Sequence, residues 1–307
     1  MPRLTATARY RHLLIALLVL TAACDRRAAA PQPGGTGTPC TSRTDCPRGQ
    51  ACVDSLCVAD NAPGMESAGP GKYREPRWIA LEGGTFEMGC SPGDSSCRDD
   101  ELPRHTVTVA PFDMLETEVT EYQYESLMGD NPSCHLGRAA GPDMPVECVS
   151  WDRAMQLCAT LGGRLPTEAE WELAARAGTT TRYYCGDDEA CLDAIAWYGA
   201  NSAKTKHDVA GKVPNAFGLY DMIGNVYEWT LDFRSEKYPS EPNQKDPLGP
   251  PEGLYRTRRG GDFYSFDARD LRVSSRTYRG PWDGPGNLGF RCVRPSAASG
   301  RGAPESF

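Results

Sequence analysis

The stretch that decides the fold runs from Pro214 to Phe233 and reads PNAFGLYDMIGNVYEWTLDF. Aromatic and aliphatic residues stand between glycines and asparagines, which predicts short strands and loops rather than a long helix. The whole chain has the same character, with 32 glycines, 25 prolines and only 39% hydrophobic residues among 307 positions. This composition predicts a loop-rich globular domain and argues against a coiled coil or a solenoid.

Charge and cysteine content restrict the setting in which the chain works. It carries 41 acidic and 33 basic side chains, a net charge of -8, so nucleic acid is not an expected partner, because phosphate binding needs a basic surface. It also holds 13 cysteines, and no two of them have the Cys-x-x-Cys spacing of a metal or redox motif. The sequence therefore predicts an oxidising compartment, in which thiols form disulfides.

The N-terminus predicts export and a lipid anchor. Arginines precede the apolar run Leu13 to Ala23, which is too short to cross a bilayer and has the order of a signal peptide, assigned to residues 1–23. Small residues before Cys24 resemble a bacterial lipobox, whose cysteine receives lipid. The alternative is an ordinary cleaved signal with an incidental cysteine. We expect a protein anchored by lipid to a membrane of the bacterial cell envelope, periplasmic or surface-exposed, with a flexible tether at 24–39.

A small cysteine-rich module is predicted at residues 40–60. In an oxidising compartment its four cysteines would form two disulfides, with three connectivities open, and a zinc site is the less favoured interpretation. These cysteines are Cys40, Cys46, Cys52 and Cys57. A Gly- and Pro-rich linker at 61–73 separates the module from the main domain at 74–296, and a disordered tail is expected at 297–307.

Capping signals predict three short helices in the main domain. A capping box places Thr and Glu or Gln three residues apart, so that each side chain satisfies a backbone N–H of the first turn. The predicted helices run from Glu121 to Met128 after Thr120, from Ser150 to Gly162, and from Thr167 to Gly178.

Apolar or alternating runs predict strands near the start of the domain. Trp78 to Leu81 and Thr85 to Met88 flank Gly83-Gly84, which is the pattern of a hairpin. His105 to Val109 alternates like a half-buried strand. We therefore expect the first two strands to pair with each other across the glycines.

Eight sequence blocks between Trp78 and Arg294 together resemble the formylglycine-generating enzyme, or sulfatase-modifying-factor, family. Any one block would be weak evidence, but the ordered set is specific. The resemblance implies a largely irregular α+β fold related to C-type lectins, preceded here by the disulfide-stapled module. Function still has to be argued from the site. Besides the stretch quoted above, the blocks are GGTFEMG, ELPRHTVTV, ETEVT, PVECVSWDRAMQLC, GGRLPTEAEWELAARAG, RGGDF and GNLGFRC.

The resemblance also implies a chemistry whose metal ligands are absent from the expected positions. The best-known family members are copper-dependent oxidases that use oxygen to convert a sulfatase cysteine into formylglycine, with copper(I) held by two cysteines after the tandem glycines. Those positions hold Ser265 and Asp270 here, and Asp262 stands where the enzymes usually have serine. Hydroxyl and carboxylate groups are hard ligands, whereas copper(I) prefers thiolates. Copper is therefore not an expected cofactor.

The remaining cysteines of the main domain are expected to be structural. The resemblance implies a disulfide between Cys158 and Cys292. Three further pairs are close enough in sequence to bridge locally, which would use all eight cysteines. These pairs are Cys90 with Cys97, Cys134 with Cys148, and Cys185 with Cys191.

A loop in the deciding stretch has the oxygen donors that calcium prefers. Asp221 and Glu228 offer carboxylates, and Gly224 permits a tight path between them. In the family this segment holds structural calcium, which implies side-chain ligands from Asp221 and Glu228 and carbonyl ligands from Gly224 and Val226. The alternative is a loop in which Asp221 and Asn225 only shape a turn. A second family calcium site near Asn201 is not expected, because the acidic segment that completes it is shortened.

Arginine and histidine content leave weaker interpretations. Nine arginines between Arg256 and Arg294 either hold an anionic ligand or, as we favour, satisfy polar groups of irregular loops.

Related domains in ergothioneine-forming sulfoxide synthases imply a three-histidine iron site. Iron is disfavoured here because His105, His135 and His207 are isolated in the sequence.

Two functions follow from these observations. The first is an envelope lipoprotein that keeps the family fold without copper chemistry and acts as a binding, scaffold or accessory maturation factor toward an envelope protein, a peptide or a small ligand. The second is an oxidoreductase that modifies an exported protein or peptide through another metal, with Asp262 and Asp270 as hard ligands near Ser265. We favour the first, because a fold persists more readily than its site chemistry.

Overall fold

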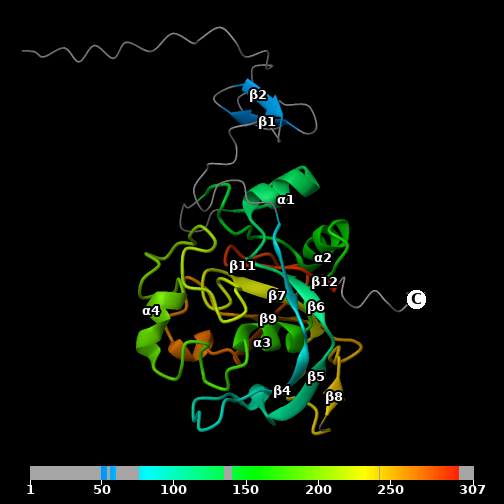
Figure 1. Ribbon diagram of the computed structural model, residues 1–307, viewed down its shortest axis with the longest axis vertical. Coiled ribbons are helices and arrows are strands. Elements are labelled where there is room, and N and C mark those ends of the chain that lie inside the picture. The colour runs from blue at the N-terminus through cyan, green and yellow to red at the C-terminus, as the bar shows by residue number, and fades with distance from the viewer. Residues whose placement is uncertain (1–49, 54–55, 60–75, 135–139, 242, 297–307) are drawn as a thin grey trace, which may run out of the picture. The chain divides into compact units, whose positions relative to one another are not determined.

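The computed structural model describes residues 50–53, 56–59, 76–134, 140–241 and 243–296. The chain divides into two compact units, residues 1–67 and 68–307, each described by itself (Figure 1). Within the described ranges, no helix has the length and apolar character that a membrane span needs. The predicted signal peptide, lipidated Cys24, tether, linker and tail lie outside these ranges.

The first unit contains one described hairpin. Strands β1 (Gln50–Val53) and β2 (Leu56–Ala59) pair antiparallel, with Cys52 opposite Cys57 in the register. The hairpin lies inside the predicted cysteine-rich module. The disulfide connectivity of that module stays a prediction.

Three sheets build the described part of the second unit (Figure 1). The largest has the order β10-β9-β7-β11 and joins Arg276–Arg279, Arg256–Arg259, Tyr227–Phe233 and Leu288–Gly289. The second has the order β12-β6-β3 and joins Val293–Pro295, Phe112–Leu115 and Trp78–Leu81. The third has the order β4-β5-β8 and joins Gly84–Met88, His105–Val109 and Gln244–Lys245.

The predicted helices are confirmed. Helix α1 spans Glu121–Met128, its cap Thr120 accepts the backbone N–H of Gln123, and Gly129 ends it at a φ of 84°. Helices α2 (Trp151–Thr160) and α3 (Glu168–Arg176) also begin after their predicted caps, and each ends just before its predicted glycine. Short turns complete the set, namely η3 (Asp99–Glu101), η4 (Glu189–Cys191), α4 (Leu192–Ile195) and η5 (Ala268–Leu271).

The predicted hairpin between the first two strands is wrong. Both strands form, but β3 pairs with β6 and β4 pairs with β5, in different sheets. Gly83 lies between them at a φ of 67°, and a Cβ atom there would meet the carbonyl oxygen of Val109 at 2.3 Å. The glycine therefore lets the chain pass close to the end of β5 and cross from one sheet to the next, instead of turning back on itself.

Helix α3 links two of the sheets. It packs against β4 and β5 on one side and against β7 and β9 on another, and all nine of its residues are buried (Figure 1). Trp171 of this helix is fully buried and donates its indole N–H to Glu228 Oε2 of β7 at 2.9 Å. A buried indole needs such an acceptor, so this bond fixes the helix against the largest sheet.

Buried arginines complete the core. Arg259 pairs with Glu172 at 2.6 Å, and Arg272 donates to both carboxylate oxygens of Glu101 at 2.5 and 2.6 Å. Both guanidinium groups are fully buried. Removing one partner of such a pair leaves an uncompensated charge in the core, which typically costs about 3–5 kcal/mol. These contacts support the structural interpretation for these two members of the arginine cluster.

Four disulfides confirm the predicted pairing in the second unit. The bond between Cys158 and Cys292 joins residues 134 positions apart and ties α2 to the segment before β12, with both cysteines fully buried. The other three close short loops. They are Cys90–Cys97, Cys134–Cys148 and Cys185–Cys191.

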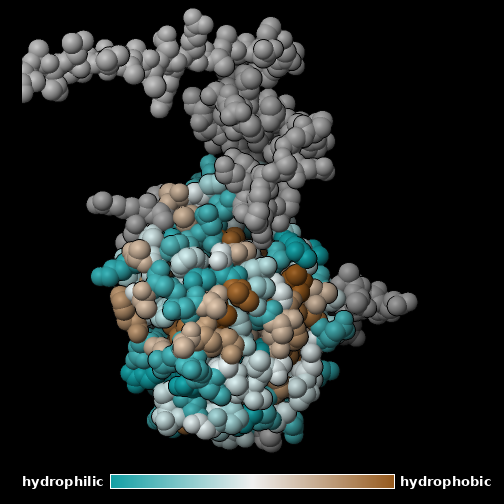
Figure 2. Space-filling model, turned by 60° about the vertical axis from the view of Figure 1, so that its left-hand side comes forward, coloured by the Kyte–Doolittle hydropathy of each residue, from teal (hydrophilic) through white to brown (hydrophobic). Residues whose placement is uncertain are grey.

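The surface is of mixed polarity. Figure 2 shows one face of the molecule, on which hydrophobic residues form small groups among hydrophilic ones. Several large apolar side chains are nevertheless exposed, among them Phe266 at 64%. Phe266 lies next to a predicted site residue, Ser265.

Candidate functional site

Ser265 and Asp262 lie in a tight turn after the tandem glycines. The hydroxyl of Ser265 donates to Asp262 Oδ1 at 2.7 Å, and the backbone N–H of Asp262 donates to Ser265 Oγ at 3.1 Å. Gly261 precedes them at a φ of 75°, and a Cβ atom there would meet the side chain of Leu271 at 2.7 Å. Both site side chains are buried. The protein itself therefore holds the serine hydroxyl.

Both carboxylate oxygens of Asp262 are occupied. Oδ1 also accepts the backbone N–H of Tyr264 at 3.2 Å, and Oδ2 accepts an N–H from the Asn287 side chain. Burial raises the pKa of Asp262, although the hydrogen bonds from Ser265 and Asn287 oppose this shift. The site therefore contains a buried carboxyl group with a full set of protein donors.

Asp270 lies beside the same glycine but faces a different partner. Its Oδ1 forms an ion pair with Arg98, which also donates to the hydroxyl of Ser275 at 3.1 Å. A Cβ atom on Gly261 would lie 3.1 Å from the Asp270 carbonyl oxygen and 3.5 Å from Ser265 Oγ. The fold thus brings the Ser265 hydroxyl and the Asp270 backbone close to Gly261, while each side chain has its own partner.

Tyr227 and Arg258 lie next to this turn. The guanidinium carbon of Arg258 is 4.0 Å from the centroid of the Tyr227 ring, a cation–π contact. Burial and the charge of Asp262 raise the pKa of Tyr227, and a hydrogen bond with Ser265 opposes this shift. Arg258 is only 9% exposed, and its Nε and Nη1 have no hydrogen-bond partner among the described residues. These two donors are enclosed by the protein and receive no acceptor from its described residues.

Cysteine thiols are not available from the described part of this unit. All eight cysteines whose side chains the structure describes are in disulfides. A thiolate pair near Ser265 would therefore need a reduced disulfide or a cysteine outside the described ranges. The prediction that copper is not the cofactor remains a prediction.

The predicted calcium loop is tightly folded. Asp221, Gly224 and Asn225 all have left-handed backbone conformations, with φ values of 54°, 84° and 55°. A Cβ atom on Gly224 would meet the carbonyl oxygen of Trp197 at 2.4 Å, so only glycine fits there. Left-handed non-glycine residues are uncommon and are retained where the surroundings require them. The surrounding structure therefore fixes the backbone path of this loop.

Three buried carboxylates meet at this loop. Asp221, Glu228 and Glu118 are each at most 1% exposed, and Glu118 accepts the backbone N–H of Val226 at 3.1 Å. Burial and the nearby charges of Asp221 and Glu228 raise the pKa of Glu118 well above its ordinary value. One guanidinium, that of Arg291, pairs with Glu228 at 2.7 Å. Among the described residues, these three carboxyl groups do not lie close enough together to share one metal ion as they stand, so calcium at this loop stays a prediction.

A buried lysine follows Asn201 closely in the sequence, in the shortened segment where no second calcium site is expected. Lys206 is fully buried, and its ammonium donates to Glu121 Oε1 at 2.6 Å and to Glu147 Oε1 at 3.0 Å. It also donates to the Pro145 carbonyl at 3.0 Å. The chain itself therefore supplies a cation to these two carboxylates.

Sequence reasoning missed several site residues, among them Arg98, Glu118, Arg258 and Asn287. Glu118 and Asn287 belong to the blocks ETEVT and GNLGFRC, so a polar residue inside a family block was the available signal. Arg258 was counted only within the arginine cluster. Nothing in its neighbouring sequence distinguishes it, because its burial depends on the pairing of β7 with β9 and of β9 with β10.

Comparison with known proteins identifies the family. A family model described as "Sulfatase-modifying factor enzyme 1-like domain" matches residues 65–296. The chain belongs to this sulfatase-modifying-factor family. Its second unit accordingly has the largely irregular α+β fold of the formylglycine-generating enzymes.

The relatives of this sulfatase-modifying-factor chain include one named as an enzyme and one named as inactive. It is 32% identical to the formylglycine-generating enzyme of Streptomyces coelicolor, over 81% of this chain and 100% of that protein. It is 29% identical to the mouse protein named "Inactive C-alpha-formylglycine-generating enzyme 2", over 76% and 89%. The solved structure of PvdO from Pseudomonas aeruginosa is similar, with a TM-score of 0.65 and 29% identity over 72% and 95%. Family membership alone therefore does not decide whether this chain is an enzyme.

Proposed function

We propose that this sulfatase-modifying-factor domain acts without copper–thiolate oxidation, as a binding, scaffold or accessory maturation factor in the bacterial cell envelope. One observation carries the proposal, the 2.7 Å hydrogen bond from Ser265 to the buried carboxyl of Asp262. The family resemblance implies a copper-binding cysteine at the position of Ser265. A hydroxyl that is already bonded to a carboxyl group is a poor ligand for a soft metal ion.

The second implied metal position supports the same proposal. Asp270 forms an ion pair with Arg98, so a metal ion there would have to displace a guanidinium. A carboxylate also prefers hard cations to copper(I). Neither position therefore has the chemistry that the copper enzymes use.

Side chains around the site favour ligand binding. Tyr264 is 39% exposed and Phe266 is 64% exposed, and these two aromatic residues flank Ser265. Exposed aromatic residues are typical of recognition sites. The expected ligand is an envelope protein, a peptide or a small molecule that packs against these two aromatic rings.

The N-terminal sequence supports the envelope setting. A lipid on Cys24 would tether the domain to a membrane through residues 24–39, and the disulfides of the second unit suit an oxidising compartment. Expression with a radioactive or clickable fatty acid tests this part of the proposal. Label is expected on the wild-type chain, and its persistence in the Cys24→Ser variant would contradict lipidation at that residue.

An aldehyde assay tests the proposed lack of oxidase activity. The full-length chain is incubated with a Cys-x-Pro-x-Arg peptide, copper and oxygen, beside the Streptomyces coelicolor relative as a positive control. The relative is expected to form aldehyde and this chain is expected to form none. Aldehyde in stoichiometric excess over this chain would overturn the proposal.

A second candidate is an oxidoreductase that modifies an exported protein or peptide through a hard metal. It is favoured by the position of Asp262 and Asp270, because both carboxyl groups raise the pKa of the same phenol, Tyr227. Peptide oxidation that requires manganese or iron would support it, provided that Asp262→Asn and Asp270→Asn each abolish the activity without unfolding the chain.

A further inference from the structure

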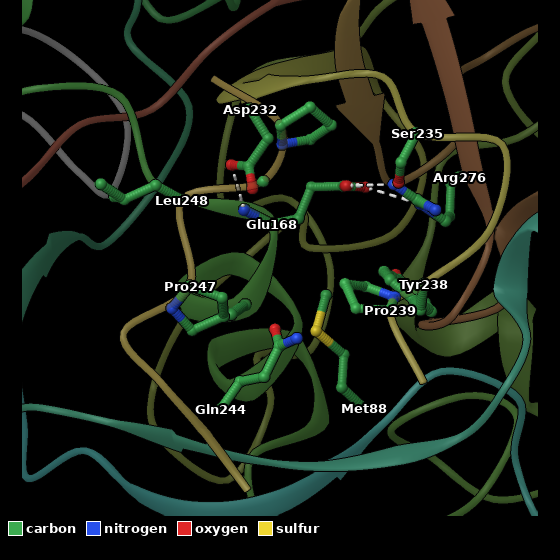
Figure 3. Close-up of a pocket in the computed structure, with 13 residues that line it drawn as sticks. Met88, Glu168, Asp232, Ser235, Tyr238, Pro239, Gln244, Pro247, Leu248 and Arg276 are labelled. Carbon is green, nitrogen blue, oxygen red and sulfur yellow. Dashed lines mark hydrogen bonds and ion pairs between the residues drawn. The ribbon is translucent and has the colours of Figure 1, made fainter. Parts of the chain in front are cut away.

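A cavity lies apart from the residues of the Ser265 site. Its volume is about 360 Å³, which is within the range of small-molecule sites, and it lies between the start of α3, the end of β7 and the loop on both sides of β8. Figure 3 shows Asp232 and Glu168 on one side of this cavity and Gln244, Pro247 and Met88 on the other. Neither the function proposed above nor the family resemblance uses it.

Most of the cavity wall is apolar. Met88, Ala169, Tyr238 and Leu248 supply hydrocarbon or aromatic surface, together with several prolines of the loop. Leu248 is 62% exposed and marks the opening toward solvent. A ligand with an apolar body would be removed from water here, which favours binding.

The ion pair of Glu168 and Arg276 at the cavity already uses the hydrogen-bonding groups of both side chains. Glu168 turns toward Arg276, which donates its Nε–H to Glu168 Oε1 at 3.0 Å and pairs with Oε2 as well (Figure 3). Arg276 also donates to the Asp100 carbonyl oxygen at 2.7 Å. Its guanidinium is therefore not available to an anionic ligand.

Asp232 is the polar group that remains available. It is 4% exposed, and its Oδ2 accepts the backbone N–H of Glu168 at 2.8 Å. No hydrogen bond from the described residues reaches its Oδ1, which lies on the side of Gly249, where a Cβ atom would come within 2.9 Å of it. Asp232 lines the cavity, and its Oδ1 is not among the fully enclosed polar atoms that lack a partner, so a donor inside the cavity can reach it. The ligand that it suits is a hydrogen-bond donor of positive charge.

We propose that this cavity binds a small organic cation whose nitrogen donates to Asp232 Oδ1. An amidinium, guanidinium or ammonium group would contact the carboxylate, and its apolar body would pack on Met88, Ala169 and Tyr238. The cation belongs either to a free amine or to a basic side chain of a peptide. The two sources share the same chemistry and are separated by the experiment below.

The charges around Asp232 set the pH at which such a ligand binds best. Burial and the charge of Glu168 raise the pKa of Asp232 to about 8. Below that pH a cation must displace a proton, so the apparent affinity should be at least about tenfold weaker at pH 6 than at pH 8. The other charged groups that act on Asp232 are Glu170, Arg276, Arg256 and Arg164.

Calorimetric titration of the full-length chain, solubilised in detergent, tests the proposal. The probes are benzamidine, neutral benzamide and anionic benzoate, which have similar size and differ in charge. We expect benzamidine to bind at pH 8 at least tenfold more tightly than the other two, and to weaken at pH 6. Equal binding of benzamidine and benzoate would overturn the proposal.

Variants separate loss of the site from loss of the fold. Asp232→Asn keeps the shape and an oxygen acceptor and should weaken benzamidine at least tenfold, whereas the exposed Asp267→Asn should not change it. Leu248→Ala at the exposed opening should weaken it severalfold. If Asp232→Asn melts cooperatively and binds benzamidine as the wild type does, the assignment is wrong. Melting curves for all three variants accompany the titrations.

A comparison of free and peptide-bound guanidines identifies the source. Agmatine represents a free amine, and N-acetyl-arginine amide represents a side chain within a peptide. Tighter binding of agmatine supports a free cation as the ligand, and tighter binding of the arginine amide supports a peptide. Binding of neither compound, together with no binding of benzamidine, contradicts the proposal.

Discussion

The hydroxyl of Ser265 donates to Asp262 Oδ1 at 2.7 Å, and the backbone N–H of Asp262 returns a bond to Ser265 Oγ at 3.1 Å. This reciprocal pair closes the turn that follows Gly260 and Gly261. It also binds the serine to a carboxyl group whose other oxygen is held by Asn287. Ser265 therefore stabilises a loop at the position where the family resemblance implies a copper ligand.

Asp262→Ala should destabilise the chain. The change leaves the buried Ser265 hydroxyl without its acceptor, which costs about 1–3 kcal/mol, whereas the part-buried N–H groups of Tyr264 and Asn287 can bond to water. Urea denaturation should show a loss of about 2 kcal/mol in the free energy of unfolding. The matched control is Asp99→Ala, at an exposed aspartate, which should stay within about 0.5 kcal/mol. Equal effects of the two changes would contradict this interpretation.

Lys206→Met should be among the most destabilising single substitutions in the domain. The change leaves Glu121 and Glu147 buried without their ammonium partner, and breaking a buried pair in this way costs about 3–5 kcal/mol. Lys237→Met provides the control, because Lys237 is exposed and lies 3.9 Å from an exposed aspartate. Thermal denaturation of both variants makes the comparison. A similar melting temperature for the two would show that the Lys206 contacts are not what stabilises this region.

Calcium removal should lower the melting temperature. A bound cation would offset the repulsion among Asp221, Glu228 and Glu118, and a ligand that binds only the folded state stabilises it by mass action. Scanning calorimetry with and without a calcium chelator measures the effect, and elemental analysis measures the metal content. We expect one bound calcium and a decrease of several degrees on chelation. A chain that contains no calcium and melts identically with chelator would contradict the ligand assignment.

Asp232 should make the domain less stable as the pH rises from weakly acidic to neutral. Its pKa is raised from 3.8 to about 8, so the folded state retains a proton that the unfolded chain releases. The free energy of unfolding therefore falls between about pH 4 and about pH 8 and then levels off. In Asp232→Asn this decrease should be smaller. Melting temperatures that fall in parallel for wild type and variant across this range would rule out Asp232 as the cause.

Local signals in the sequence predicted the helices and failed on strand pairing. The capping box of Thr120 and Gln123 lies within four residues, so α1 could be bounded correctly. The partner of β3 is β6, which starts at Phe112, and no short-range pattern near Gly83 specifies it. Glycines that look like a hairpin turn serve instead for a close approach to Val109. Pairing between distant strands depends on the whole fold rather than on the turn.

The candidate site likewise contains residues that the sequence predicted and partners that only the structure reveals. Ser265 and Asp262 are three residues apart, and the family blocks identified both positions. Arg98 pairs with Asp270 across 172 residues, and Glu118 reaches the loop of Val226 across 108 residues. No spacing rule connects such residues, so the partners that complete the site emerge only from the structure. Asp232 likewise becomes distinctive only when the loop beyond β7 encloses a cavity around it.

Copper(I) titration against a competing chelator, followed by X-ray absorption at the copper edge, tests the central claim most directly. The Ser265→Cys, Asp270→Cys double variant is the positive control, because it restores the thiol pair that the family resemblance implies. We expect the double variant to bind one copper(I) with sulfur ligands, and the wild-type chain to leave the metal with the chelator. A wild-type chain that binds stoichiometric copper(I) through two sulfur atoms would contradict the account.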